Sequence, residues 1–185
     1  MALMRVAAAY VYTLESEEPI RNGYVEYDSE DGTIRSVGYC EEGEDVLPGA
    51  IVPGFVNCHC HIELSHLYKK FRKGTGMAGF IDQINELRDW AGAEVKAHLV
   101  QQWMDKMWAD GVSAMADISN DDSSFMVKKA HNMYTRTFLE VFGSEPEMCE
   151  GVMADVTALK QTSQKVLQSN PLGRLRPYAH CCAPA

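Results

Sequence analysis

The sequence lacks several features that would place it in a special class of protein. No apolar run approaches the roughly 20 residues of a membrane-spanning helix, and the start has no charged segment followed by a long apolar one, as a signal peptide would. Six cysteines in 185 residues are too few and too irregularly spaced for a disulfide-stapled scaffold. These absences predict a cytoplasmic protein with reduced thiols and no membrane partner.

Basic residues are also scarce. The chain has 17 Lys and Arg against 26 Asp and Glu, a net charge of -9, and the basic residues are scattered along it. A nucleic-acid-binding protein needs a basic stripe or patch, so nucleic acid is excluded as the main partner. The hydrophobic fraction of 46% and the charged fraction of 23% are those of an ordinary globular protein.

Hydrophobic patterning divides the chain into two parts. Residues 1–50 alternate apolar and polar positions, with turn signals at Asn22-Gly23 and Asp31-Gly32, and predict a small antiparallel β-sheet. Residues 51–185 predict alternating strands and helices, an arrangement typical of a parallel sheet. The fold class is therefore α/β.

Within the second part, the run "AIVPGFVN" at 50–57 predicts a strand buried on both faces. Further strands are predicted at 112–119 and 134–143, and another begins within 173–185. Helices are predicted at 80–90, 94–109, 121–132 and 145–168. The helix at 94–109 would bury one apolar side, made of Val95, Leu99, Trp103, Met107 and Trp108, and end at Gly111.

The run "FVNCHCHIELSHL" at 55–67 carries the chemistry. Because strand side chains alternate between faces, His59 and His61 point the same way, and Cys58 and Cys60 point the other way. Two imidazoles at the carboxyl end of a parallel strand are placed to bind one divalent cation, and imidazole suits zinc, iron and nickel. The plain alternative is two unconnected histidines at a strand end.

Other residues have competing interpretations. A structural zinc cluster of Cys58, Cys60 and the Cys181-Cys182 pair has the wrong spacing, because structural zinc uses cysteines separated by two to four residues. Asp117 is either a functional carboxylate at a strand end or a helix N-cap. His66 is either a pocket residue or a surface histidine. The tryptophans at 90, 103 and 108 are expected to be packing anchors.

Four stretches together resemble the N-terminal half of the amidohydrolase superfamily. They are "NGYVEYDSEDGTIRSVG", "LPGAIVPGFVNCHCHIELSHL", "GVSAMADIS" and "RTFLEVFG". The run P-G-F-V-N-x-H-x-H is the most specific part. The chain is most similar to the branch that holds chlorohydrolases and cytosine, guanine and aminofutalosine deaminases. "HIELSHL" and the Gly-rich loop after it resemble the aminofutalosine deaminases.

This resemblance implies a partial (β/α)8 TIM-like barrel at 51–185, preceded by part of a β-sandwich at 1–50. His59 and His61 would bind one divalent metal, Zn or Fe. The substrate pocket would be lined by Glu63, Ser65, Glu140 and His180. The catalytic residues of the family lie in its C-terminal half, and a full barrel needs about 250 residues. We therefore expect a truncated or fragmentary member.

Two functions follow as expectations. The first is a metal-dependent hydrolase of C–N bonds other than peptide bonds, a deaminase of a purine, pyrimidine or nucleoside-like amine. The second is a non-catalytic fragment that folds only partly or acts through association, for example as a homo-oligomer, because a half barrel exposes two edge strands. The substrate is open within the class of small amine-bearing molecules.

Overall fold

The structure is a computed structural model that describes residues 2–141, 143, 145–167 and 178–181. Its strands are β1 (Leu3–Val11), β2 (Ile20–Asp28), β3 (Ile34–Tyr39), β4 (Leu47–Ile51), β5 (Phe55–Cys60), β6 (Val112–Ser119), β7 (Tyr134–Val141) and β8 (Tyr178–Cys181). The α-helices are α1 (Gly76–Leu87), α2 (Ala93–Ala109), α3 (Phe125–Ala130) and α4 (Cys149–Leu167), and two 3-10 helices are η1 (Ile62–Leu67) and η2 (Pro146–Met148). None of the described helices is long and apolar enough to cross a membrane.

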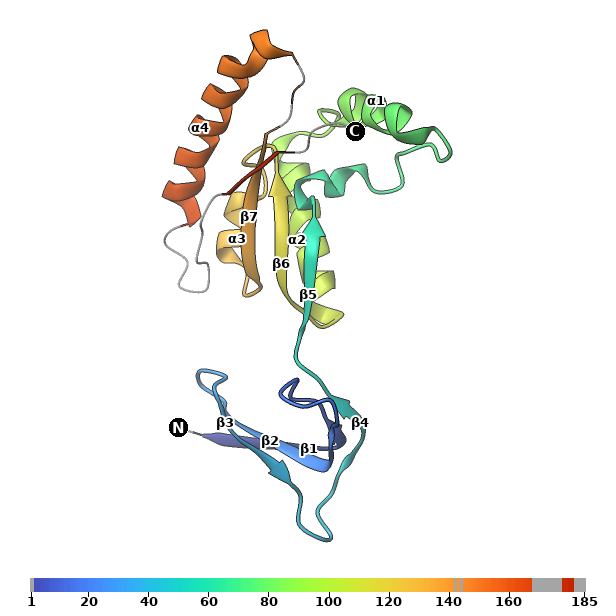
Figure 1. Cartoon of the computed structure of the whole chain (residues 1–185), viewed down its shortest axis with the longest axis vertical. Coiled ribbons are helices and arrows are strands. Elements are labelled where there is room, and N and C mark those ends of the chain that lie inside the picture. The colour runs from blue at the N-terminus through green and yellow to red at the C-terminus, as the bar shows by residue number, and fades with distance from the viewer. Residues whose placement is uncertain (1, 142, 144, 168–177, 182–185) are drawn as a thin grey trace. The chain divides into compact units, whose positions relative to one another are not determined.

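The chain divides into two compact units, Met1–Pro53 and Gly54–Ala185. The first unit is one four-stranded sheet in the order β3-β2-β1-β4 (Figure 1). The predicted antiparallel pairing is confirmed for β1, β2 and β3, whereas β4 runs parallel to β1. The described part of this unit therefore contains one sheet, and the β-sandwich that the resemblance implies stays a prediction.

Of the two predicted turns in the first unit, one is confirmed. The Asp31-Gly32 signal lies in the β2–β3 connection, where Gly32 has φ +71° and donates its N–H to the Asp28 carbonyl over 2.8 Å. The Asn22-Gly23 turn was wrong, because both residues lie inside β2. A Cβ at Gly23 would come within 2.8 Å of the Ile20 side chain, so this glycine serves close packing rather than chain reversal.

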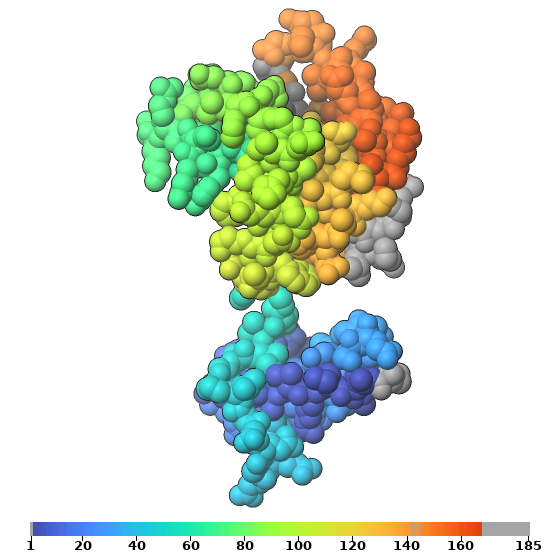
Figure 2. All heavy atoms as spheres, turned by 180° about the vertical axis from the view of Figure 1, so that it is seen from behind, coloured from blue at the N-terminus to red at the C-terminus, as the bar shows by residue number. Residues whose placement is uncertain are grey.

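The second unit is built on a parallel sheet in the order β5-β6-β7-β8. In Figure 1 the strands lie in front of α2 and α3, and Figure 2, turned by half a rotation, shows the same helices covering that face. The predicted order of strands and helices from residue 50 onward is confirmed, with η1 and η2 added. The strand expected near the end of the chain is present as β8, which pairs with β7.

The predicted burial of the run "AIVPGFVN" was wrong. Its two halves belong to different sheets, because β4 pairs with β1 and β5 pairs with β6. β5 is an edge strand of the described sheet, and Phe55 and Val56 remain 61% and 59% exposed. An apolar edge of this kind is a feature that folded proteins normally cover or close.

Two apolar clusters hold the second unit together. One joins Ile62 of η1, Val100 and Met104 of α2, Met115 of β6 and Met133. The other joins Phe125 of α3, Leu139 of β7 and Leu167 of α4. The predicted buried side of α2 was partly wrong. Trp103 and Met107 pack against the first cluster, but Val95 and Trp108 are exposed, because the stripe facing η1 and β6 is centred on Val100 and Met104.

The end of α2 at Gly111 is confirmed and gives a test of the backbone. Gly111 has φ +89° and donates its N–H to the Trp108 carbonyl over 3.0 Å. Substitution Gly111→Ala places a Cβ in a left-handed conformation and is expected to lower the free energy of unfolding by about 1 kcal/mol or more. The measurement is urea denaturation of the purified chain.

Gly151→Ala is the matched control. Gly151 lies in the first turns of α4, where an added Cβ meets no atom within 4 Å. The same substitution there is expected to raise the free energy of unfolding by about 0.5–1 kcal/mol, because alanine favours a helix interior over glycine. Effects of the same sign and size at both positions would contradict the conformational argument.

Candidate functional site

The carboxyl ends of β5, β6 and β7 bring together side chains that are far apart in the sequence. The strands are parallel neighbours, so their carboxyl ends share one edge of the sheet, where α/β proteins build their sites. His59 and His61 lie at the end of β5, Asn120 follows β6, and Glu140 lies near the end of β7. Glu63 joins them from η1, directly after β5.

His59 and His61 lie side by side. Their ring centroids are 5.5 Å apart with the ring planes at 67°, an edge-to-face contact. The simple alternation expected for β5 is interrupted, because the register with β6 shifts between Asn57 and Cys60. One extra residue of this kind bends a strand and re-aims its side chains. Cys60 packs against the α2 cluster, whereas Cys58 is exposed.

His61 has a carboxylate next to it. Its Nδ1 atom is 3.5 Å from Oε1 of Glu63, a side chain that is only 1% exposed. The Glu63 carboxylate raises the pKa of the His61 imidazole, against the opposing effect of burial. The contact lacks hydrogen-bond geometry. His61 Nδ1 and Glu63 Oε2 are both buried and have no hydrogen-bond partner among the described residues, so each is available to a ligand.

Asn120 connects two carboxylates at this edge. Its side-chain amide donates to Oε2 of Glu140 over 2.8 Å and to Oε1 of Glu63 over 3.3 Å. The Asn120 backbone N–H also donates to Glu63 Oε1 over 3.3 Å. Like-charged carboxylates repel one another at short range, and the amide donors offset that repulsion. The result is a pair of acidic groups held close to His61.

Asp117 supports the site from the helical face of the sheet. It is fully buried, and its Oδ1 accepts the backbone N–H of Ile62, the first residue of η1, over 2.7 Å. Its Oδ2 accepts the Ser119 hydroxyl over 2.9 Å and forms an ion pair with Lys128 of α3, which is also buried. Lys128 donates in turn to the hydroxyls of Ser119 and Thr137 over 2.9 and 3.3 Å. Asp117 therefore lies at a strand end as predicted, and it is buried in contact with the first N–H of η1.

Three further residues singled out in the sequence are Ser65, His66 and His180. Ser65 of η1 donates its hydroxyl to the Ile62 carbonyl over 2.7 Å and lines a separate cavity. His66 lines the same cavity and is 3% exposed. His180 lies in β8 opposite Glu140, and its side chain is outside the described part of the structure, as is Cys182.

The cysteines do not form a zinc cluster in the part of the chain that the structure describes. Cys40, Cys58, Cys60 and Cys149 are free thiols. Across the described residues, no group of three or more His, Cys, Asp and Glu side chains is placed to hold a metal ion. A metal at this edge would therefore have the two histidines and would need further ligands.

Sequence reasoning missed Asn120, Ser119 and Lys128. Asn120 directly follows the predicted strand at 112–119, so its place at the strand end was a usable signal. Lys128 carried no such signal, because a lysine in a short helix is nearly always on the surface. Only the packing of α3 against β6 and β7 shows that it is buried.

Comparisons with known proteins found similar solved structures but no match by sequence. No protein-family model matches the chain, and no curated protein matches it by sequence. The solved structures it resembles include a triazine hydrolase from Arthrobacter aurescens (14% identity, TM-score 0.70) and the aminofutalosine deaminase of Helicobacter pylori (18%, 0.65). A third is an adenosine deaminase from Xanthomonas campestris with bound zinc (16%, 0.66).

These alignments cover nearly all of this chain but less than half of each neighbour. They span 97–98% of this chain and 47%, 43% and 42% of the three structures, in the same order. At such identities the likeness shows the fold alone. The chain thus has the fold of the corresponding part of these hydrolases and deaminases.

The Asp117–Lys128 pair generates a prediction about stability. Removing one partner of a buried pair leaves the other charge uncompensated, so Lys128→Met is expected to lower the free energy of unfolding by about 3–5 kcal/mol. The measurement is chemical denaturation, with Lys160→Met as a control at an exposed position of α4. The control is expected to change stability by less than about 0.5 kcal/mol. A similar small loss for Lys128→Met would show that the pair does not hold the site together.

A second prediction concerns thiol reactivity in the run that carries the histidines. Burial raises the pKa of the Cys60 thiol to about 12, and Asp117 and Glu63 add to the shift. Because the thiolate is the reactive form, Cys60 is expected to resist iodoacetamide at pH 7.5 while exposed Cys58 reacts. Peptide mass spectrometry separates the two sites, and Cys58→Ser should abolish labelling of this peptide in the folded chain. Rapid labelling of Cys60 would contradict its placement in the core.

Proposed function

We propose that this chain carries the first part of the site of a metal-dependent hydrolase that acts on C–N bonds other than peptide bonds, a deaminase of a purine, pyrimidine or nucleoside-like amine. The observation that carries the proposal is the edge-to-face pair of His59 and His61 at the carboxyl end of an edge strand, with rings 5.5 Å apart. The fold shared with triazine hydrolase and with aminofutalosine and adenosine deaminases supports it. The parallel sheet of the second unit would be the first half of a (β/α)8 barrel.

The residues present fit part of a zinc or iron site. Imidazole nitrogens suit both metals, and the Nδ1 atom of His61 is buried without a hydrogen-bond partner among the described residues. Catalytic zinc has three protein ligands and an open position, and the two histidines would supply two of them. A bound divalent metal would lower the pKa of a water molecule and so provide hydroxide near neutral pH.

The acidic groups would bind the substrate rather than the metal. Glu63 and Glu140 present carboxylate oxygens next to His61, and Glu63 Oε2 is buried with no hydrogen-bond partner among the described residues. An ionised carboxylate is an acceptor only, so it selects ligands with N–H groups. Amino-substituted purines, pyrimidines and triazines all present such groups. Ser65 and His180 would line the same substrate pocket, as the resemblance implies.

The second candidate function is a non-catalytic chain that acts through association. The exposed apolar side chains of β5 favour it, because Phe55 and Val56 lie on an open sheet edge. It would leave the histidines without the remaining ligands unless a partner chain, such as a second copy, supplied them. It predicts no turnover of any amine substrate, even with added zinc or iron.

Zinc affinity tests the proposed site independently of activity. The purified chain is freed of metal with a chelator and titrated with Zn²⁺ against a chromophoric competitor. We expect one zinc per chain, and at least about a tenfold loss of affinity in His59→Ala and in His61→Ala. His98→Ala, which changes an exposed histidine of α2, is the matched control and is expected to bind zinc like the parent chain. Equal zinc binding by all four chains would reject the site.

Turnover then separates the two candidate functions. Ammonia release from guanine, adenosine, cytosine and melamine is measured with the zinc-loaded chain at several protein concentrations. Release that depends on His61 supports the hydrolase. Zinc binding without any release, together with self-association, supports the second function.

A further inference from the structure

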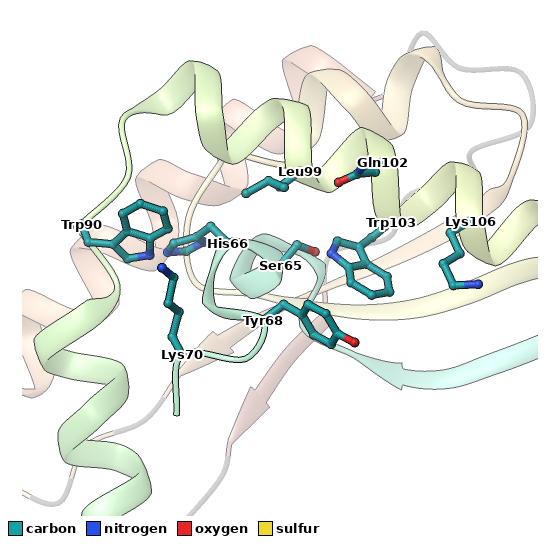
Figure 3. A pocket seen from close by; sticks show the side chains of 9 residues that line it. All are labelled: Ser65, His66, Tyr68, Lys70, Trp90, Leu99, Gln102, Trp103 and Lys106. Carbon is teal, nitrogen blue, oxygen red and sulfur yellow. The ribbon is translucent and has the colours of Figure 1, made fainter. Parts of the chain in front are cut away.

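A cavity in the second unit lies apart from the strand-end cluster. Its volume is about 410 Å³, which is within the roughly 300–1,000 Å³ of small-molecule pockets. It is formed by η1, the residues after it, the segment after α1 and one side of α2 (Figure 3). None of His59, His61, Glu63, Asn120 and Glu140 lines it.

The walls of the cavity are largely aromatic and aliphatic. Trp103 and Leu99 project from α2 on one side, and Trp90 closes one end (Figure 3). Tyr68 supports Trp103 in an edge-to-face contact with ring centroids 4.6 Å apart. In Figure 3 the indole nitrogen of Trp103 faces Ser65 across the cavity. Two indoles and an isobutyl group favour a flat apolar body between them.

The charge of the cavity is opposite to that of the protein. The chain has a net charge of -9, yet the charged residues that line the cavity are Lys70 and Lys106, with no Asp or Glu among the described lining residues. Lys106 is committed to Asp110, with its Nζ 2.9 Å from the carboxylate. Lys70 has no carboxylate partner among the described residues, and its Nζ lies 4.5 Å from the Trp90 ring centroid.

His66 adds to this environment. The imidazole is 3% exposed, and its two nitrogens lie 3.0 Å from the Glu63 carbonyl and 2.8 Å from the Arg88 carbonyl. The ring also packs against Trp90, with centroids 6.3 Å apart. The end of the cavity at Trp90 therefore joins an aromatic surface to the Lys70 ammonium group.

We propose that this cavity binds a planar aromatic anion, with its ring against Trp103 and Leu99 and its anionic group at Lys70. The ligand class follows from the two wall types: indole faces recognise a flat ring, and the Lys70 ammonium group, without a carboxylate partner among the described residues, recognises a carboxylate or phosphate. The site is distinct from the metal-dependent one under Proposed function. The two sites adjoin each other through η1, which carries Ser65 and His66 of the cavity and Glu63 of the strand-end cluster.

The test uses the tryptophans as reporters. The full chain, labelled with 15N-tryptophan and free of metal, is titrated with 2-naphthoate, and Trp90→Phe and Trp103→Phe assign the indole N–H signals. We expect the signals of Trp90 and Trp103 to shift with one common saturation curve. Trp108 packs on His131 away from the cavity, and its signal is expected to remain in place. Equal shifts of all three signals would overturn the proposal.

Charge recognition is tested with two controls. Lys70→Gln is expected to weaken 2-naphthoate about threefold to fivefold, as loss of an exposed ion pair does, and exposed Lys73→Gln is expected to leave it unchanged. The neutral 2-naphthamide should bind the parent chain more weakly by a similar factor. Equal affinity for the acid and the amide, or equal effects of the two lysine variants, would show that the cavity does not select for a negative charge and would reject the proposal.

A final experiment distinguishes this inference from the proposed hydrolase function. The double variant His59→Ala/His61→Ala is expected to bind 2-naphthoate like the parent chain. Loss of naphthoate binding in that variant would place the ligand at the strand-end cluster and overturn the separate site. Failure of zinc binding with retained naphthoate binding would reject the proposed function alone.

Discussion

The Asp117 carboxylate ties together three segments that are distant in the sequence. One oxygen accepts the first N–H of η1, and the other meets Ser119 and the buried ammonium group of Lys128. An unpaired charge in this position would be costly, so the carboxylate and the lysine must be buried together or not at all. This requirement fixes α3 against the sheet and fixes the start of η1 against β6. The direction in which the chain leaves His61 depends on it.

The residues that support the candidate site and the residues that form it lie on different parts of the sheet. Asp117 and Lys128 are buried behind β6, on the side that the helices cover. Glu63, Asn120 and Glu140 meet next to His61 at the carboxyl edge, where two buried polar atoms have no hydrogen-bond partner in the described residues. Buried polar groups are normally satisfied, so the unsatisfied ones mark a place for a ligand. Asp117 and Lys128 have hydrogen-bond or ion-pair partners, whereas His61 Nδ1 and Glu63 Oε2 have no hydrogen-bond partner among the described residues.

The sheet edge that carries the histidines is also incomplete. β5 contributes the histidines and is also the exposed edge of the described sheet, with Phe55 and Val56 largely uncovered. The neighbours by structure are more than twice as long as the part that aligns with this chain. An incomplete ligand set and an incomplete sheet edge therefore occur on the same strand. Under the proposed function, whatever completes the sheet would lie next to the histidines.

The cavity beside η1 shows how one short helix can serve two environments. Glu63 faces the acidic cluster, and Ser65 and His66 face a space walled by Trp90, Leu99 and Trp103. The two sites are close but chemically opposite, since one is carboxylate-rich and the other is aromatic and cationic.

The sequence by itself determined the order of strands and helices in residues 54–167, because hydrophobic period and helix-ending glycine are local properties. It also predicted that His59 and His61 lie near each other at the end of a strand, and their rings are in contact although a register shift interrupts the alternation of β5. The tertiary structure decided what no local pattern contains: that Asn120 bridges Glu63 and Glu140, that Lys128 is buried against Asp117, and that β5 lies on an exposed edge. These facts depend on which distant segments become neighbours. Periodicity fixes the face a side chain occupies, but only packing fixes its partner.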